Sequence, residues 1–304
     1  MKKFFLLFFV PVFCFTCNPD RTKQQDSDYD FTFAFLTDIH LQPERGAIDG
    51  FRMAIDCVNT LNPDFIITGG DMIMDAMAAT FERADSLFNL YIRMVYEFEM
   101  PVYNTIGNHE LFGIHDNSGI DPAHPEYGKK MYENRLGQRY FSFDHKGWHF
   151  MILDGVEQGK GEWGNYIGLV DSAQLEWIRK DLSTVDASTP IVLSTHIPLV
   201  TAMPQILNGP LHRDIYSSVV VNSRDVLLPF VNHNLKLILQ GHLHIVEEIN
   251  IARKTSFIIG GAVCAKWWNT PEDSNVQEGF VLVKVKDRDF SWEYIDYGWE
   301  TLKE

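Results

Sequence analysis

Five short apolar segments of the chain each end in residue types that bind metals in proteins. The segments are residues 31–37, 65–68, 102–106, 191–195 and 235–240. Their lengths and their content of Phe, Ile, Val and Leu are typical of buried strands. Between the first three, apolar residues recur at helical spacing over 48–61 and 81–98, and Pro101 ends the second helix. This alternation of strand and helix predicts a parallel sheet in a layered α/β fold.

The second half of the chain adds more strands and one more helix. The further strands are expected at residues 140–144, 148–153, 256–260, 280–285 and 290–294. The first two pair through a tight turn at Lys146-Gly147, and residues 171–182 form the helix. Residues 111–137 are rich in Gly, Pro, Asp and His and are typical of a long loop. Because no linker interrupts residues 31–299, we expect one domain of two packed sheets with helices outside.

Composition and charge exclude several classes of protein. With 304 residues and 45% hydrophobic content, the chain buries a large core, which excludes disorder as its main state. Its 26 basic and 41 acidic residues give a net charge of −15, so we expect no polynucleotide partner. Four cysteines are too few for a disulfide scaffold, and we expect Cys264 to be buried.

The N-terminus has the pattern of an export signal. Lys2 and Lys3 precede an apolar run over residues 4–15, which is shorter than the ~20 residues that a spanning helix needs. Cys17 follows and the sequence turns polar, as in a bacterial lipoprotein signal with Cys17 as the lipidated residue; an ordinary cleaved signal peptide is the alternative. We therefore expect a signal over 1–17, a tether over 18–30, and a protein exported to the periplasm or cell envelope and anchored to the membrane through Cys17.

The residues that follow the five strands form a candidate metal site. They are Asp38, His40, Asp71, Asn108, His109, Glu110, His196, His242 and His244. In layered α/β folds, sites gather beyond the carboxyl ends of the strands. Carboxylate, imidazole and amide groups bind divalent manganese, iron or zinc, and an aspartate can bridge two such ions. Glycines before Asp71, Asn108 and His242 allow the backbone to turn and crowd the site.

The ordered set Asp-x-His, Gly-Gly-Asp, Gly-Asn-His-Glu, His and Gly-His-x-His resembles the calcineurin-like metallophosphoesterases. The resemblance implies an αββα sandwich, that is, two mixed sheets flanked by helices in the metallo-dependent phosphatase fold. It implies that the first metal is held by Asp38, His40 and His244, the second by Asn108, His196 and His242, and both by Asp71. By the same resemblance, His109 faces the phosphate and Glu110 orients the site.

The reaction implied is hydrolysis of a phosphomonoester or phosphodiester by direct attack of a metal-bridging hydroxide, because coordination lowers the pKa of water to ~7 in favourable cases. Met74, three residues after Asp71, replaces the ligand tyrosine of purple acid phosphatases, and His109 replaces the arginine of lipid A-type hydrolases. A nucleotide, a sugar phosphate and a lipid head group all stay open as substrates. Two other hypotheses stay open. The chain is a non-catalytic, surface-anchored binding protein, or it is a cytoplasmic cyclic nucleotide phosphodiesterase and its N-terminal segment is not an export signal.

Four residues outside the motifs are candidates for contact with the substrate. His115 and Asp116 follow the Gly-Asn-His-Glu motif and are placed at the entrance to the site. Trp267 and Trp268 are adjacent, so both cannot be core residues on one face; they form either an aromatic wall for the substrate or packing under the last strands. Asp75 is interpreted as a turn or cap residue.

Overall fold

Strand β2, Phe31–Leu36, shows how the layers of the fold arise from the sequence. In the computed structural model, which describes residues 15–16, 29–159, 165–212, 217–269 and 277–300, alternate side chains of this strand enter different clusters. Phe33 and Phe35 pack between the two sheets, whereas Ala34 and Leu36 pack toward the helices. A strand that is apolar on both faces in this way has to lie at the centre of a layered fold.

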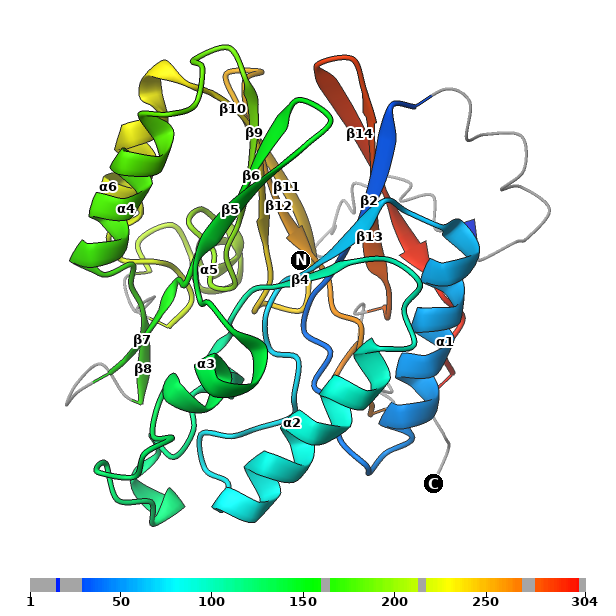
Figure 1. Ribbon diagram of the computed structural model, residues 1–304, viewed down its shortest axis with the longest axis vertical. Helices are drawn as coiled ribbons and strands as arrows, with labels where there is room; N and C mark the ends of the chain where they lie inside the picture. The colour runs from blue at the N-terminus through cyan, green and yellow to red at the C-terminus, as the bar shows by residue number, and fades with distance from the viewer. Residues whose placement is uncertain (1–14, 17–28, 160–164, 213–216, 270–276, 301–304) are drawn as a thin grey trace, which may run out of the picture.

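Two six-stranded mixed sheets pack face to face, with helices outside (Figure 1). The first sheet has the order β1 (Phe15–Thr16), β14 (Asp289–Asp296), β13 (Phe280–Lys286), β2, β3 (Phe65–Thr68) and β4 (Val102–Asn104). The second has the order β11 (Val246–Ile251), β12 (Thr255–Gly260), β10 (Asn234–Gln240), β9 (Pro190–Ser194), β6 (Trp148–Ile152) and β5 (Phe141–His145). Strands β2, β3 and β4 are parallel, as are β12, β10, β9 and β6. The predicted αββα architecture is confirmed.

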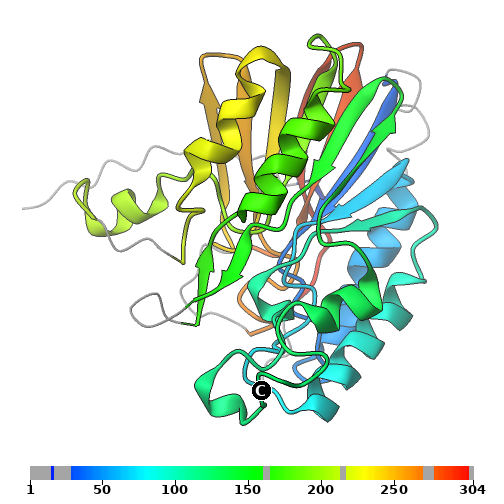
Figure 2. The same ribbon diagram turned by 60° about the vertical axis from the view of Figure 1, so that its left-hand side comes forward.

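Helices cover the outer face of each sheet. Helices α1 (Ala47–Leu61) and α2 (Phe81–Val95) lie on the side of the first sheet, and α4 (Ser172–Leu182) and α6 (Ser223–Leu227) on the side of the second (Figures 1 and 2). Thr80 and Asp171 cap α2 and α4 by accepting hydrogen bonds from the backbone N–H groups of Arg83 and Gln174. No helix in the described ranges is both long enough and apolar enough to span a membrane.

Several short elements were not expected. The region predicted as one long loop, 111–137, contains the 3-10 helix η3 (Asp116–Ser118) and helix α3 (Lys130–Leu136). The prediction also missed β11, the hairpin of β7 (Val156–Gln158) and β8 (Tyr166–Gly168), helices α5 (Met203–Asn208) and α6, and η5 (Leu228–Asn232).

Two boundaries test the finer expectations. The second helix ends at Val95, six residues before Pro101, so proline does not end it. The turn at Lys146-Gly147 is confirmed, and both residues have positive φ, 44° and 81°, as a tight hairpin requires. The predicted export signal and tether fall mainly on residues 1–14 and 17–28, which lie outside the described residues.

Candidate metal centre

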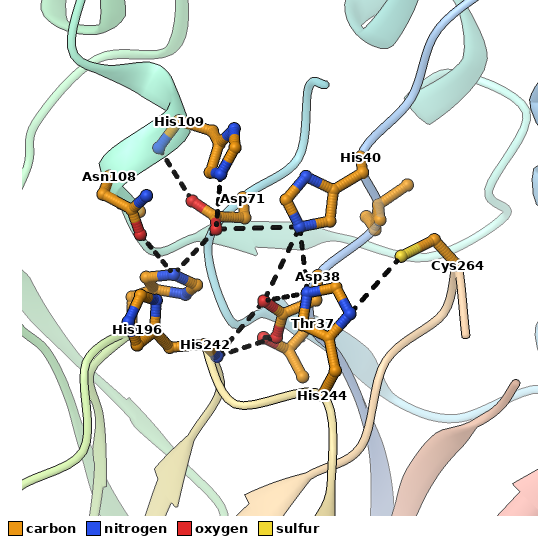
Figure 3. A network of polar contacts seen from close by, with 12 residues as sticks. Thr37, Asp38, His40, Asp71, Asn108, His109, His196, His242, His244 and Cys264 are labelled. Carbon is orange, nitrogen blue, oxygen red and sulfur yellow. Dashed lines mark hydrogen bonds and ion pairs between the residues drawn. The ribbon is translucent and has the colours of Figure 1, made fainter. Parts of the chain in front are cut away.

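The predicted ligands come together at the carboxyl ends of strands from both sheets (Figure 3). The segments after β2 and β3 bind one another beyond the ends of the strands. The Asp38 N–H donates to Gly70 O (3.0 Å), and the His40 N–H donates to Asp71 O (2.9 Å). This pairing places both aspartates at one edge. The 3-10 helix η2, Asn108–Glu110, follows β4, and His196 and His242 follow β9 and β10.

Asp71 lies at the centre of the cluster. Its Oδ1 accepts a hydrogen bond from the His109 backbone N–H at 2.9 Å. Its Oδ2 faces three imidazole rings, with Nε2 of His196 at 3.0 Å, Nε2 of His40 at 3.7 Å and Nε2 of His109 at 3.8 Å. The position of this carboxylate, between rings that come from different strands, suits a group that bridges two cations.

On one side of Asp71 lie Asp38, His40 and His244. His244 Nε2 is 3.2 Å from Asp38 Oδ1 and 3.1 Å from His40 Nε2. Asp38 is fully buried, and its Oδ2 accepts hydrogen bonds from Thr37 Oγ1 (2.6 Å) and the His242 N–H (2.9 Å). Thr37 and the His242 backbone thus fix the carboxylate in one orientation.

On the other side lie Asn108, His196 and His242. His196 Nε2 is 3.1 Å from Asn108 Oδ1, and the rings of His196 and His242 are 5.1 Å apart between centres. Nδ1 of His242 is buried and has no hydrogen-bond partner among the described residues, and the same holds for Nδ1 of His40. One ligand atom each from Asp71, His196 and His242 lies within 4.8 Å of the others, as do atoms of His40, Asp71 and His109.

This donor set fits cations. His196 Nδ1 donates to Gly69 O at 2.7 Å, so in the neutral ring Nε2 carries a lone pair that faces the oxygens of Asp71 and Asn108. His244 Nδ1 donates to Ala265 O at 2.9 Å, which leaves its Nε2 lone pair facing Asp38. Lone pairs that converge in a buried site need either protons or metal ions between them.

The charges of the cluster shift the pKa of the acidic residues and their partners. Burial by itself raises the pKa of Asp71, but the charge and hydrogen bond of His196 hold it well below its usual value. Burial likewise raises the pKa of Asp38, yet His244 lowers it to about 2. Burial lowers the pKa of His196, but the Asp71 carboxylate raises it to about 9, and Asp38 raises the pKa of His244 well above its ordinary value. Two ion pairs therefore occupy the cluster when no cation is bound.

His40 and His242, in contrast, have lowered pKa values. Burial is the largest effect on His40 and lowers its pKa well below the ordinary value, and burial lowers the pKa of His242 to about 4. Both rings are neutral at pH 7 and can donate a lone pair to a cation. Binding of two cations would release protons only from the ion-paired histidines.

Five of the seven predicted ligands have left-handed backbone conformations. These are Asp38, His40, Asp71, His242 and His244, with φ between 45° and 72°. Such conformations are uncommon for residues with a Cβ and concentrate at functional sites. The ligands themselves make the turns, and the expectation that the preceding glycines do so is correct only for Gly70, with φ 91°. Gly241 matters for space, because a Cβ there would lie 2.0 Å from Thr37 Oγ1.

Glu110 supports the site through hydrogen bonds to the backbone of the ligand segments. Its carboxyl group is fully buried and accepts hydrogen bonds from the backbone N–H groups of Asp71, Met72, Ile73 and Gly107 at 2.7–3.2 Å. Burial and the neighbouring Asp71 charge raise its pKa to about 8. The expected orienting task therefore takes a specific form: Glu110 holds the segment after β3 against the segment after β4.

His109 lies at the solvent side of the cluster. Its ring is perpendicular to that of His40, with centres 4.6 Å apart, and its Nδ1 donates to Met74 O at 2.5 Å. Asp75, with Oδ1 3.8 Å from the same Nδ1, accepts hydrogen bonds from the N–H groups of Met77 and Ala78. The interpretation of Asp75 as a turn residue is confirmed.

The two tryptophans have different environments. Trp267 is 40% exposed, and its ring centre lies 5.1 Å from that of His244. Trp268 is 2% exposed, and its Nε1–H donates to Ile39 O and His40 O at 2.9 and 3.1 Å. The prediction that Trp268 contacts substrate is therefore wrong, because its indole fills the core and holds the Asp-x-His segment.

His115 and Asp116 lie outside the ligand cluster. His115 Nε2 accepts a hydrogen bond from Asn165 Nδ2 at 2.9 Å, whereas Asp116 is exposed in η3. Asn165 precedes Tyr166, whose ring is perpendicular to that of His242 with centres 5.9 Å apart. A role for His115 and Asp116 at the entrance stays a prediction.

Sequence reasoning missed Tyr166, Thr37 and the placement of Cys264. Cys264 is buried as expected, and its Sγ lies 3.9 Å from His244 Nδ1. No signal in the sequence pointed to Tyr166, which belongs to a short unpredicted hairpin. Thr37 directly precedes Asp38 at the end of β2, which is a position from which its hydroxyl could have been expected to contact the site.

Comparisons with known proteins agree with this geometry. The family model for calcineurin-like phosphoesterases matches residues 31–246. Among solved structures, a dimetal phosphatase from Danio rerio is similar over 89% of this chain and 98% of its own, with 15% identity and a TM-score of 0.65. GAP50 of Plasmodium is similar over 88% of this chain and 84% of its own, with 13% identity and a TM-score of 0.54. At these identities the likeness shows a shared fold. No curated protein matches the sequence.

Proposed function

The chain belongs to the calcineurin-like phosphoesterase family, and on this basis we propose that it is a two-metal phosphoesterase that acts outside the cytoplasm. The observation that carries the proposal is the position of Asp71. Its Oδ2 faces rings from both halves of the cluster, and Asp71 is common to the His40–His109 group and the His196–His242 group. A carboxylate shared between two sets of neutral and ion-paired imidazoles suits a dinuclear centre.

In this proposal each half of the cluster holds one cation. The first half consists of Asp38, His40 and His244, the second of Asn108, His196 and His242, and Asp71 serves both. Divalent manganese, iron and zinc all suit these ligands. Bound cations supply Lewis-acid chemistry, since they activate water and neutralise charge on the phosphoryl oxygens.

The residues of the chain position the reacting groups. Met74 O receives the Nδ1–H of His109 and fixes the ring, so that Nε2 points to the same side as the Asp71 carboxylate. A proton on Nε2 would pass to the ester oxygen as the P–O bond to the leaving group breaks, while the oxygen of a water molecule forms the new P–O bond. The proton that this water loses passes to solvent, and His109 takes up a proton from solvent before the next turnover. No side chain becomes phosphorylated in this scheme.

The test compares a chromogenic phosphomonoester with its matching diester, using the full-length chain supplied with manganese. Asp71→Ala should abolish hydrolysis and lower the metal content, whereas Asp186→Ala, in a surface turn after α4, should retain both. A preference for the monoester or the diester would define the reaction. Hydrolysis that persists in Asp71→Ala would refute the proposed centre.

A second candidate function is that of a non-catalytic binding protein on the same scaffold. The observation in its favour is the likeness to GAP50, which is described as an anchor in the inner membrane complex of Plasmodium. Two bound metals in the wild-type chain without hydrolysis of either ester would favour this alternative. His109 holds neither cation in this proposal, so its place beside Asp71 favours catalysis.

We also propose that the protein is exported and anchored through Cys17, as the sequence over residues 1–17 indicates. Labelling with a radioactive fatty acid should mark the wild type and spare Cys17→Ala. Fractionation of cells should place the wild type in the membrane fraction of the envelope. Recovery of the wild-type protein in the cytoplasm would instead favour the cytoplasmic phosphodiesterase.

A further inference from the structure

The segment Val263–Trp268, which follows β12, has a strained backbone beside the metal centre. Ala265, Trp267 and Trp268 have φ values of 48°, 51° and 63°, which places three residues with a Cβ in left-handed conformations within four positions. Left-handed conformations in non-glycine residues persist only where the surroundings enforce them, and they gather at functional sites. We call this segment the tryptophan strap.

The strap is held by the segment that carries the Asp-x-His motif. Its Val263 N–H donates to Thr37 O at 2.9 Å, and its Cys264 N–H donates to Asp38 O at 3.2 Å. The indole of Trp268 donates to Ile39 O and packs edge-on against Trp299, with ring centres 6.0 Å apart. Trp268 is thus the anchor of the strap.

Trp267 has no such structural task. Its side chain is 40% exposed, whereas its neighbour is 2% exposed. The indole lies against two predicted ligands, with its ring centre 5.1 Å from that of His244 and 6.0 Å from that of His40. A large aromatic side chain that is held in a strained conformation and left partly open to solvent at a metal site offers a flat surface to whatever binds there.

We propose that Trp267 is the binding platform for the leaving group of the substrate, and that this group carries a planar unsaturated ring, either an aryl group or a nucleobase. The inference rests on the proposed phosphoesterase function. The face of an indole binds another π-system by stacking, irrespective of which ring it is. His109, the proposed proton donor to the leaving group, has its ring centre 4.6 Å from that of His40, and Trp267 lies 6.0 Å from the same ring. A leaving group that takes its proton from His109 is therefore on the side of the cluster where Trp267 stands.

A lipid chain fits this position less well. The structure has a pocket of about 250 Å³ at α5, lined by five apolar residues and three polar ones: Met203, Pro204, Leu207, Leu243, Ile245, Asn208, His212 and Ser218. Trp267 is not part of that lining. An acyl chain would find its apolar surface there, at α5, and would not require an indole beside His244.

The experiment uses two esters that differ only in the planarity of the ring, benzyl phosphate and cyclohexylmethyl phosphate, or their methyl diesters if the enzyme prefers diesters. Trp267→Ala should lower kcat/KM for the benzyl ester about 10- to 100-fold, as expected for loss of one stacked ring, and leave the cyclohexylmethyl ester within about 3-fold. Trp267→Phe should restore most of the activity, and Trp267→Leu should not. Tyr96→Ala, which removes an 82% exposed aromatic ring after α2, is the matched control and should change neither ester.

The binding of benzylphosphonate, which cannot be hydrolysed, separates this inference from the proposed function. Calorimetry should give a 10- to 100-fold weaker Kd in Trp267→Ala with unchanged metal content, even if no ester is turned over. Comparison with a nucleoside 5′-monophosphate decides between an aryl group and a nucleobase. Equal losses for the benzyl and cyclohexylmethyl groups, rescue by Trp267→Leu, or loss of bound metal would each overturn the proposal, since they indicate an apolar surface or structural support of His244.

Discussion

Raising the pH of the metal-free protein should destabilise it through His196. Burial lowers the pKa of this ring, but the Asp71 carboxylate more than compensates and raises it from 6.5 to about 9. A histidine whose pKa is raised in the folded state stabilises the fold fully below pH 6.5, and this contribution is lost as the pH rises through about 9. One pKa unit corresponds to about 1.4 kcal/mol, so the shift amounts to roughly 3 kcal/mol of unfolding free energy. Asp38, with its pKa lowered to about 2, adds no change in this window, because its contribution is lost only as the pH falls below about 4.

Bound cations should cancel this trend. A cation competes with the proton on His196 Nε2, the atom that lies 3.0 Å from Asp71 Oδ2. Metal binding therefore becomes tighter as the pH rises, and the stabilisation that manganese gives should increase between pH 6.5 and 9. With rising pH, the stability of the metal-free protein falls and the stabilisation by manganese grows. Both changes have the same cause, because the proton and the metal ion compete for the lone pair on His196 Nε2.

The assay is urea unfolding followed by tryptophan fluorescence, with excess chelator or with manganese, from pH 6.5 to 9.5. The chelated wild type should lose about 3 kcal/mol more than His196→Gln over this range. His124→Gln, which replaces a histidine outside the ligand cluster, should keep the wild-type slope. His196→Gln still has the ion pair of His244 with Asp38, so its stability also falls with pH. A chelated wild type whose stability falls no more steeply than that of His196→Gln would show that the ion pair with Asp71 does not form.

Three further substitutions test other parts of the structure. His109→Ala should abolish hydrolysis and leave the metal content unchanged, as measured by elemental analysis, and unchanged hydrolysis would refute its assigned role. Glu110→Ala should lower the unfolding free energy by about 3–6 kcal/mol, because four buried N–H groups lose their acceptor, whereas Glu176→Ala on the exposed face of α4 should change it by less than about 0.5 kcal/mol; urea midpoints decide. Gly50→Ala should cost about 1–3 kcal/mol and lower the thermal midpoint, since the new Cβ would lie 2.3 Å from the Trp268 ring; an unchanged midpoint would contradict the tight packing of the anchor.

The sequence predicted the buried strands well and the edges of the sheets poorly. Strands β2, β3, β9 and β10 are apolar runs between polar residues, and burial on both faces makes such runs easy to recognise. Strand β11 lies at an edge and alternates between half-buried and exposed residues, with charged Glu247 and Glu248 near its start, so it resembles a surface loop. The hairpin of β7 and β8 has only three residues in each strand, too few for any periodicity.

The sequence predicted which residues form the candidate site, but not how the residues around them support it. The Asp-x-His and Gly-His-x-His spacings identified side chains that do come together. The sequence could not predict that Trp268 is buried while Trp267 is partly exposed. The burial of Trp268 depends on its packing against Gly50 and Trp299, which lie more than 30 residues away along the chain. The same applies to Glu110, whose acceptors serve a segment that begins 39 residues earlier.

The strain at the ligands indicates that the protein, and not the metal, builds the centre. Five left-handed ligands cost about 1 kcal/mol each, so the conformation needs a support of comparable strength. The described residues provide such a support: the segments after β2 and β3 bind each other, Thr37 holds Asp38, and Glu110 holds the N–H groups around Asp71. In the absence of metal, protons on His196 and His244 satisfy the lone pairs that face the carboxylates. A centre that is supported in this way keeps its geometry when the metals leave, so chelation should remove activity at neutral pH while the fold persists, and the stability of the chelated protein should fall as the pH rises from 6.5 to about 9.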